Sequence, residues 1–351
     1  MTDIREILKE AVSLCASDIF IVSGTAVSYK VFGNVMAKDN ETVMPGDAET
    51  LIGDILKLAE IETPADEISR EMDFSFSMAG VGRFRVNVYR QRSTLAAVLR
   101  NVLFDLPDSS KLNIPESIME LSETNNGIIL LTGAAGSGKS TTLTCMIDRI
   151  NSTRPGHIVT IEDPIEFLHK HKKSIISQRE IGIDTDSYAD ALRAALRQSP
   201  NVILLGEMRD FETISAAITA AETGVLLFST LHTSSAANTI NRIVDVFPAA
   251  QQVQIRGQLA QLIRGVVCQQ LVPTTDGTIT PVFEVLKSNP AIQNMIRENK
   301  LHQLESAMQA AKAEGMMTMD NSLFELYQKG IITKETLLNT CNNYEFVSKR
   351  I

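Results

Sequence analysis

The sequence is poor in aromatic residues and contains no tryptophan. Phe and Tyr make up only 5% of its 351 residues, so the stacked aromatic platforms on which single-stranded nucleic acids bind are not expected. An excess of basic residues is also missing, because 42 Asp and Glu outnumber 33 Lys and Arg and the net charge is −9. This excludes a protein whose whole surface binds nucleic acid or anionic lipid, but it leaves room for a local basic site.

Closely spaced cysteines and long apolar runs are missing as well. The sequence has four cysteines and no C-x-x-C pair, which argues against a zinc ribbon and an extracellular disulfide framework. The charged N-terminus, residues 1–6, lacks the apolar core of a signal peptide. Apolar runs such as 127–131 and 225–228 are far shorter than the ~20 residues that span a bilayer. We therefore expect a soluble cytoplasmic protein with no membrane span.

The length of the chain predicts two domains, since a typical domain has about 100–200 residues. A polar, proline-containing stretch separates two periodic regions and predicts a linker over 105–113. We expect a first domain over 1–104 that opens with a helix over 2–17. The second domain is expected over 114–351, with helices from about residue 288 onward.

Charge in the first region is segregated into an acidic stretch and a basic one. Residues 39–73 hold eleven Asp or Glu and two basic residues, a composition typical of a solvated helical surface. Residues 81–100 hold five arginines and no acid. The alternation over 83–89 predicts a strand with apolar side chains on one face and Arg83, Arg85 and Asn87 on the other. Such a row of cations suits phosphate, and salt bridges to the acidic stretch are the alternative.

Beyond residue 113, short apolar runs alternate with helical patterns. This arrangement is typical of a mainly parallel α/β sheet whose strands are buried on both faces. The buried strands are expected at 127–131, 157–161, 201–205 and 224–228.

A phosphate-binding loop follows the first of these strands. The pattern G-x-x-x-x-G-K-[ST] is followed by Thr141 and is formed by Gly133, Ala134, Ala135, Gly136, Ser137, Gly138, Lys139 and Ser140. A strand before the motif and a helical pattern after it provide the required context. The loop N–H groups and the helix N-terminus would bind phosphate. Lys139 would contact the β- and γ-phosphates, and Ser140 would supply a hydroxyl to Mg²⁺.

Residues suited to hydrolysis follow the other buried strands. Because ligands of an open α/β sheet bind beyond the carboxyl ends of its strands, we expect these residues to meet the phosphates. They are Glu162, Asp163, Glu166, Glu207 and His232. One carboxylate could hold Mg²⁺ through water, another could orient or deprotonate the attacking water, and the histidine could stabilise the γ-phosphate. Spacing alone does not assign roles among the first three.

Four motifs in this order resemble those of a known family, the hexameric ATPases of type II and type IV secretion and of type IV pili. They are the phosphate-binding loop, an aspartate box at 160–167, an atypical Walker B segment at 204–210 and a histidine box at 229–233. The short chain, the lack of a tetracysteine insert and the stretch 289–298 are most similar to the pilus retraction ATPases of twitching motility.

The resemblance implies a fold and a set of site residues. A smaller PAS-like α+β domain would precede a RecA-like P-loop ATPase domain with helices at its C-terminal end, and six copies would form a ring. At matching positions, Glu207 would be the Walker B carboxylate near Mg²⁺, Glu166 the water-activating base and His232 the γ-phosphate sensor. Arg85 and Arg100 would reach the nucleotide across a domain or subunit interface.

The resemblance also implies a motor that hydrolyses ATP with Mg²⁺ and drives type IV pilus retraction. Its partners would be an inner-membrane pilus platform protein and a paralogous pilus ATPase, with no direct nucleic-acid contact. It would work in the cytoplasm at the inner face of the cell membrane. Related secretion, DNA-uptake or accessory pilus ATPases are the alternatives within the family. A P-loop small-molecule kinase is disfavoured because no lid-like arginine segment follows the phosphate site, and the intact carboxylate set disfavours a regulator without hydrolysis.

Overall fold

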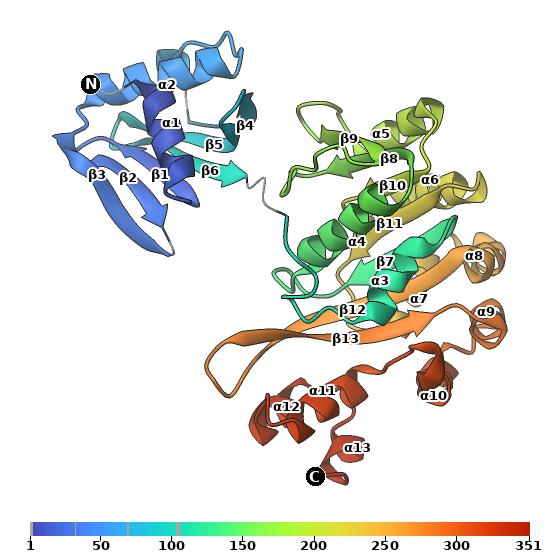
Figure 1. Ribbon diagram of the computed structural model, residues 1–351. Coiled ribbons are helices and arrows are strands. Elements are labelled where there is room, and N and C mark those ends of the chain that lie inside the picture. Colours follow the sequence, from blue (N-terminus) through green and yellow to red (C-terminus); the bar gives the residue numbers. More distant parts are fainter. Residues whose placement is uncertain (1–2, 32, 69, 103–105) are drawn as a thin grey trace. The chain divides into compact units, whose positions relative to one another are not determined.

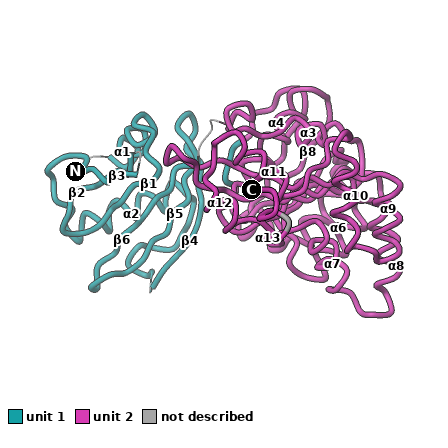
Figure 2. Tube along the Cα trace, turned by 90° about the horizontal axis from the view of Figure 1, so that it is seen from below, with its two compact units in different colours: residues 1–105, 166–168 teal, residues 106–165, 169–351 magenta. Residues whose placement is uncertain are grey.

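The computed structural model describes residues 3–31, 33–68, 70–102 and 106–351. The chain divides into two compact units, which Figure 2 shows in different colours. Unit 1 comprises residues 1–105 and 166–168, and unit 2 comprises residues 106–165 and 169–351. The expected end of the first domain at residue 104 lies outside the described residues.

Unit 1 is an antiparallel sheet with two helices packed on one face (Figure 1). The strand order is β3-β2-β1-β6-β5-β4. Apolar residues of the helices, such as Leu8 and Ile52, join one buried cluster with Ile19 and Val86 of the sheet. The elements are α1 (Ile4–Ser13), β1 (Asp18–Val22), β2 (Ala26–Val31), β3 (Asn34–Thr42), α2 (Pro45–Leu58), η1 (Ala65–Glu67), β4 (Glu71–Met78), β5 (Gly82–Gln91) and β6 (Thr94–Val102).

Two expectations for this unit need correction. The first helix is shorter than predicted: Asp3 caps it by accepting a hydrogen bond from the Arg5 N–H at 2.9 Å, and Cys15 has a φ of 53°, outside the helical range. The acidic stretch 39–73 is not a helical surface throughout, because it also contains the end of β3 and the start of β4.

The β5–β6 hairpin confirms the alternation that the sequence predicts. Phe84, Val86 and Val88 are fully buried, and Arg85 is exposed on the opposite face. The hairpin register pairs Arg85 with Arg100 of β6. The two arginines singled out from the sequence therefore lie side by side on one face of the sheet.

Unit 2 is built on a sheet of mostly parallel strands. The order is β13-β12-β7-β11-β10-β8-β9, and among the described strands of this sheet the β12–β13 pair alone is antiparallel. The strands are β7 (Gly127–Thr132), β8 (Gly156–Glu162), β9 (Ser174–Glu180), β10 (Val202–Leu205), β11 (Leu226–Leu231), β12 (Ile263–Pro273) and β13 (Ile279–Lys287).

Helices cover both faces of this sheet (Figure 1). Ile129 and Leu131 of β7 pack into one core layer with α3 (Glu116–Met119) and α4 (Lys139–Thr153), while Ile128 and Leu130 point into the other. The second layer contains α5 (Tyr188–Ala195), α6 (Phe211–Glu222), α7 (Ala236–Asp245) and α8 (Ala249–Leu262). Short 3₁₀ turns are η2 (Glu120–Glu123), η3 (Leu196–Gln198), η4 (Leu301–Gln303) and η5 (Lys312–Glu314).

The C-terminal region is helical from residue 290, as predicted. Its helices are α9 (Pro290–Arg297), α10 (Leu304–Ala310), α11 (Met319–Gln328), α12 (Lys334–Thr340) and α13 (Tyr344–Ser348). In the described parts of the chain, no helix is long and apolar enough to cross a bilayer.

The predicted strand at 224–228 is displaced. β11 begins only at Leu226, because Gly224 has a φ of 97°, and it continues to Leu231. Ser229 and Thr230 are therefore buried strand residues, and His232 directly follows the strand. Leu231 is paired with Thr132 of β7, so the phosphate-binding loop and His232 start from adjacent points on the sheet.

Candidate nucleotide site

The phosphate-binding loop takes a conformation that its glycines permit. Gly133 and Gly138 have φ values of 145° and 85°, which favour glycine. A Cβ atom at Gly133 would lie 2.2 Å from the carbonyl oxygen of Gln269, so this position also excludes side chains by contact. Gly138 is the N-cap of α4, and the loop therefore opens directly into the helix N-terminus.

Lys139 is folded back onto the loop. Its Nζ donates hydrogen bonds to the carbonyl oxygens of Gly133 and Ala134, each at 2.8 Å, and the residue is 8% exposed. Ala134, Ala135, Gly136 and Ser140 are exposed, whereas Ser137 is buried and Thr141 half-buried. Loop and lysine are thus brought together as the motif predicts, with the cation beside the loop backbone.

Gln269 supports the loop from the neighbouring strand, a role that the sequence did not reveal. Its side-chain Oε1 accepts a hydrogen bond from the Thr142 hydroxyl at 2.8 Å, and the residue is 3% exposed. Gln269 lies on β12, which pairs with β7 immediately before the loop. The two residues are 127 positions apart, so no local pattern could have linked them.

Glu207 and His232 come together as expected. The His232 Nε2 lies 3.4 Å from the Glu207 Oε2, and Arg209 Nε contacts the same oxygen at 2.6 Å. The turn that carries Glu207 is fixed to its neighbours, because the Gly206 N–H donates to the Ile161 carbonyl and the Thr230 hydroxyl donates to the Gly206 carbonyl. A half-buried carboxylate is therefore held between a guanidinium and an imidazole at the sheet edge.

The three carboxylates of the aspartate box have different environments. Glu162 is tied to the sheet, since its Oε1 accepts hydrogen bonds from the Thr160 hydroxyl at 2.6 Å and from the Gln178 amide at 3.3 Å. Asp163 is exposed, as is Glu166. Glu166 groups with unit 1, whereas Lys139 belongs to unit 2, and the role of Glu166 stays a prediction.

Tyr188, at the start of α5, lies close to these acidic residues and was also missed. Burial raises the pKa of its hydroxyl, and the negative charges of Asp163 and Glu207 raise it further. A Cβ atom at Gly206 would lie 2.8 Å from this hydroxyl, which explains a glycine before Glu207. The phenol is therefore a neutral group among carboxylates.

The basic stretch 81–100 has a partner outside the acidic stretch. Arg100 Nε lies 3.0 Å from Oδ1 of Asp18, whose side chain is only 7% exposed. Arg90 donates to the carbonyl oxygens of Ile68 and Asp66 instead of pairing with a carboxylate there. The alternative of salt bridges to 39–73 is thus wrong for Arg100, whereas phosphate binding by this basic stretch stays a prediction.

Comparisons with known proteins identify the family of the chain. The family model described as type II/IV secretion system protein matches residues 1–329. A twitching motility protein of Neisseria gonorrhoeae is 48% identical over 79% of this chain and 75% of its own length. The type IV pilus retraction ATPase PilT of Pseudomonas aeruginosa is 42% identical, over 95% of this chain and 96% of its own.

A solved structure extends the likeness to the fold. The crystal structure of the pilus retraction motor PilT with bound ADP is 45% identical, covers 99% of this chain and 100% of that chain, and gives a TM-score of 0.87. The predicted order of a smaller α+β domain and a RecA-like ATPase domain is confirmed. This chain belongs to the family of type II/IV secretion system proteins.

Proposed function

We propose that the protein is an ATP-hydrolysing motor that drives type IV pilus retraction. The observation that carries the proposal is the phosphate-binding loop with Lys139 beside it, on a sheet whose neighbouring strands end in the Glu207–His232 pair. The relatives that cover nearly the whole chain are a pilus retraction ATPase and a pilus retraction motor crystallised with ADP. Nucleotide is therefore the ligand that the loop would bind.

The loop offers several groups to a triphosphate. The Ser137 hydroxyl is buried and has no hydrogen-bond partner among the described residues, so a phosphate oxygen would satisfy it. The N–H groups at the start of α4 add the positive end of a helix dipole. Lys139 would exchange the two carbonyl oxygens that it now contacts for phosphate oxygens.

Mg²⁺ fits the oxygen donors at this site. Among the described residues, no group of three or more His, Cys, Asp or Glu could hold a metal without other ligands. A hydroxyl from Ser140 and the carboxylate of Glu207 suit an ion that takes its remaining ligands from phosphate and water. When bound with ATP, Mg²⁺ would neutralise charge that develops on the transferred phosphoryl group.

The remaining residues would carry out hydrolysis. Glu166 would orient and deprotonate the attacking water, and His232 would contact the γ-phosphate. Arg209 holds the Glu207 carboxylate in place beside His232. Arg85 and Arg100 would supply positive charge to the nucleotide when a ring of six copies closes.

The motor would act at a membrane without spanning it. We place it in the cytoplasm, as a homohexamer at the inner face of the cell membrane, where it would bind a pilus platform protein and work with a paralogous pilus ATPase. Hydrolysis in the ring would supply the force for retraction.

The experiment combines purified protein with a deletion in the host. The purified chain should hydrolyse ATP as a hexamer, and phosphate transfer to a small acceptor would instead support a kinase. The deletion strain should lose surface motility and accumulate pili that do not retract, whereas a strain without pili would indicate an extension motor.

Complementation of the deletion strain tests the role of Lys139. A plasmid that encodes Lys173→Ala should restore motility, and one that encodes Lys139→Ala should not. Lys173 is an exposed lysine whose Nζ contacts the Thr153 carbonyl, so it controls for loss of positive charge.

A further inference from the structure

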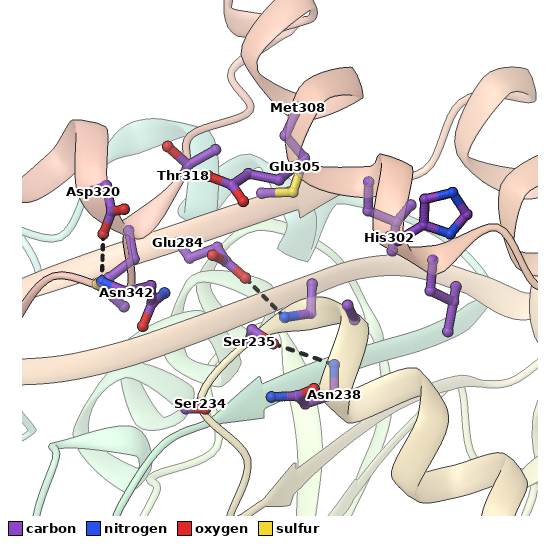
Figure 3. A pocket seen from close by; sticks show the side chains of 15 residues that line it. Ser234, Ser235, Asn238, Glu284, His302, Glu305, Met308, Thr318, Asp320 and Asn342 are labelled. Carbon is purple, nitrogen blue, oxygen red and sulfur yellow. Dashed lines mark hydrogen bonds between the residues drawn. The ribbon is translucent and has the colours of Figure 1, made fainter. Parts of the chain in front are cut away.

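A pocket of about 330 Å³ lies at the far end of the histidine box. It is enclosed by the first turn of α7, by strand β13 and by the C-terminal helices α10 and α11 (Figure 3). Its lining begins at Ser234, two residues after His232, and continues through Ala236. The wall opposite these residues contains Glu284, which none of the four motifs includes.

Glu284 is a buried carboxylate bound to the start of α7. The residue is 6% exposed, and its Oε1 accepts a hydrogen bond from the Ala236 N–H at 2.7 Å, drawn as a dashed line in Figure 3. Burial raises the pKa of the carboxyl, while hydrogen bonds from the backbone of Ala236 and Met319 favour the carboxylate. A negative group at this place is stabilised by the positive end of α7.

Glu284 is aligned across the sheet with residues that adjoin the phosphate-binding loop and the histidine box. The strand registers align Glu284 with Cys268, Cys268 with Thr132, and Thr132 with Leu231. The Cys268 Sγ lies 3.6 Å from the Glu284 Oε1. Because Thr132 precedes the phosphate-binding loop and Leu231 precedes His232, Glu284 is at the level of the sheet from which the loop and His232 extend.

The turn after His232 has two kinds of anchor. Local hydrogen bonds join it to its own helix: one between the Thr233 and Thr239 hydroxyls at 2.7 Å, and one from the Asn238 N–H to the Ser235 hydroxyl at 3.2 Å. The bond from Ala236 to Glu284 crosses to β13 and is thus a different kind of restraint. Farther along α7, Ile240 and Ile243 are buried in the core, which would hold the rest of the helix without Glu284.

We propose that Glu284 is a positioning residue that holds the first turn of α7 to the sheet and thereby sets the place of His232 beside Glu207. This inference rests on the proposed ATPase function. Glu284 would act through the three residues that separate His232 from Ala236. Its loss would move the histidine and leave the phosphate-binding loop able to bind nucleotide.

The test compares Glu284→Ala, Glu284→Gln and a matched control in the full-length protein. Glu305→Ala removes another carboxylate that lines the same pocket and contacts no histidine-box residue in the described hydrogen bonds. For Glu284→Ala we expect kcat for ATP to fall about tenfold with the KM for ATP and the affinity for ADP unchanged. Glu284→Gln keeps an acceptor oxygen and should recover most of kcat. Unchanged kcat in Glu284→Ala, or an equal loss in Glu305→Ala, would overturn the proposal.

Two further measurements separate positioning from general destabilisation. In a His232→Ala background, Glu284→Ala should change kcat less than about twofold, because the residue that it positions is gone. Full additivity would contradict the proposal. Amide hydrogen exchange should rise in Glu284→Ala over residues 232–240 and stay unchanged over the buried strand β7. Hydrogen exchange does not depend on ATP turnover. It therefore tests the positioning role of Glu284 separately from the proposed ATPase function, and either one can be contradicted without the other.

Discussion

At the scale of single residues, the position of the Glu207 side chain is set by two charged or polar neighbours. The guanidinium of Arg209 lies 2.6 Å from its Oε2, and the imidazole of His232 lies 3.4 Å from the same oxygen. The carboxylate is thus held in place at the end of the sheet from which the phosphate-binding loop departs. An anion at this place suits Mg²⁺ and would repel ATP that arrives without it.

Glu207→Gln tests this arrangement directly. The amide keeps the shape of the side chain but removes the charge, so we expect kcat for ATP to fall by about 100-fold or more while ADP still binds. Steady-state hydrolysis and calorimetric titration with ADP measure the two effects. Glu212→Gln is the matched control, because that exposed carboxylate pairs with Arg193 at 2.6 Å and touches no site residue. Equal turnover in both variants would rule out the proposed role of Glu207.

His169 gives the protein a dependence of stability on pH. Burial lowers the pKa of its imidazole to about 4, and its Nδ1 has no hydrogen-bond partner among the described residues. Because the ordinary pKa of histidine is about 6.5, the unfolded chain binds the proton more readily between these values. The stability contributed by neutral His169 is therefore complete above pH 6.5 and is lost as the pH falls toward 4.

We expect the free energy of unfolding to drop by about 2 kcal/mol more between pH 7 and pH 5 in the wild type than in His169→Gln. Urea unfolding followed by circular dichroism measures this, since the chain has no tryptophan for fluorescence. His302→Gln, which replaces an exposed ring, should keep the wild-type dependence. Parallel curves for wild type and His169→Gln would show that the buried ring does not titrate in this range.

At the scale of elements, the sequence predicts those helices, strands and loops that a local residue pattern determines. The alternation of β5, the buried run of β7 and the loop before α4 follow from neighbours within a few residues, and each was found in place. Gln269, Glu284 and Asp18 were not found, because each contacts a residue that is far away in the sequence and is brought close only by the fold. The displaced start of β11 has a similar cause, since the backbone at Gly224 rather than the apolar run sets where pairing begins.

Strand β12 lies close to the phosphate-binding loop, so we expect alanine substitutions at Gly133 and at Gly224 to have different effects on nucleotide affinity and stability. Gly133→Ala would bring a Cβ to 2.2 Å from the Gln269 carbonyl, which the backbone can relieve only by moving the loop or β12. We expect ATP affinity to fall about tenfold or more and unfolding to become easier by about 3 kcal/mol.

The matched control is Gly224→Ala, whose φ of 97° is equally unfavourable for alanine but whose Cβ would meet nothing within 4 Å. It should cost about 1 kcal/mol of stability and leave ATP affinity intact. Both variants can be compared by thermal unfolding and by titration with ADP. Equal affinities would mean that contact with β12 does not shape the loop.

At the scale of the whole molecule, the net charge of −9 is unevenly distributed, with an acidic stretch over 39–73 and a basic stretch over 81–100. The exposed face of the unit 1 sheet carries Arg85 directly opposite Arg100, and Arg100 already has a buried partner in Asp18. The pairing holds Arg100 in a fixed orientation, whereas Arg85 is exposed next to a second cation. Two adjacent guanidiniums repel each other unless an anion lies near, and a nucleotide triphosphate in a ring of six copies would be such an anion.

This reasoning predicts the result of mixing two inactive variants. Arg85→Ala should lower kcat about 100-fold with unchanged unfolding, and Lys139→Ala should abolish turnover. If the arginine of one chain serves the phosphate-binding loop of another, mixed hexamers contain interfaces that unite an intact Lys139 with an intact Arg85. Hydrolysis should then return after subunit exchange, to roughly a quarter of the wild-type rate at equal proportions if interfaces act independently.

A mixture of Lys139→Ala with Glu207→Gln is the control, because both residues belong to unit 2 of one chain. Every interface that contains a normal lysine then contains a defective carboxylate. Recovery in the control as well would point to an artefact of exchange, and no recovery in the first mixture would place Arg85 in the site of its own chain.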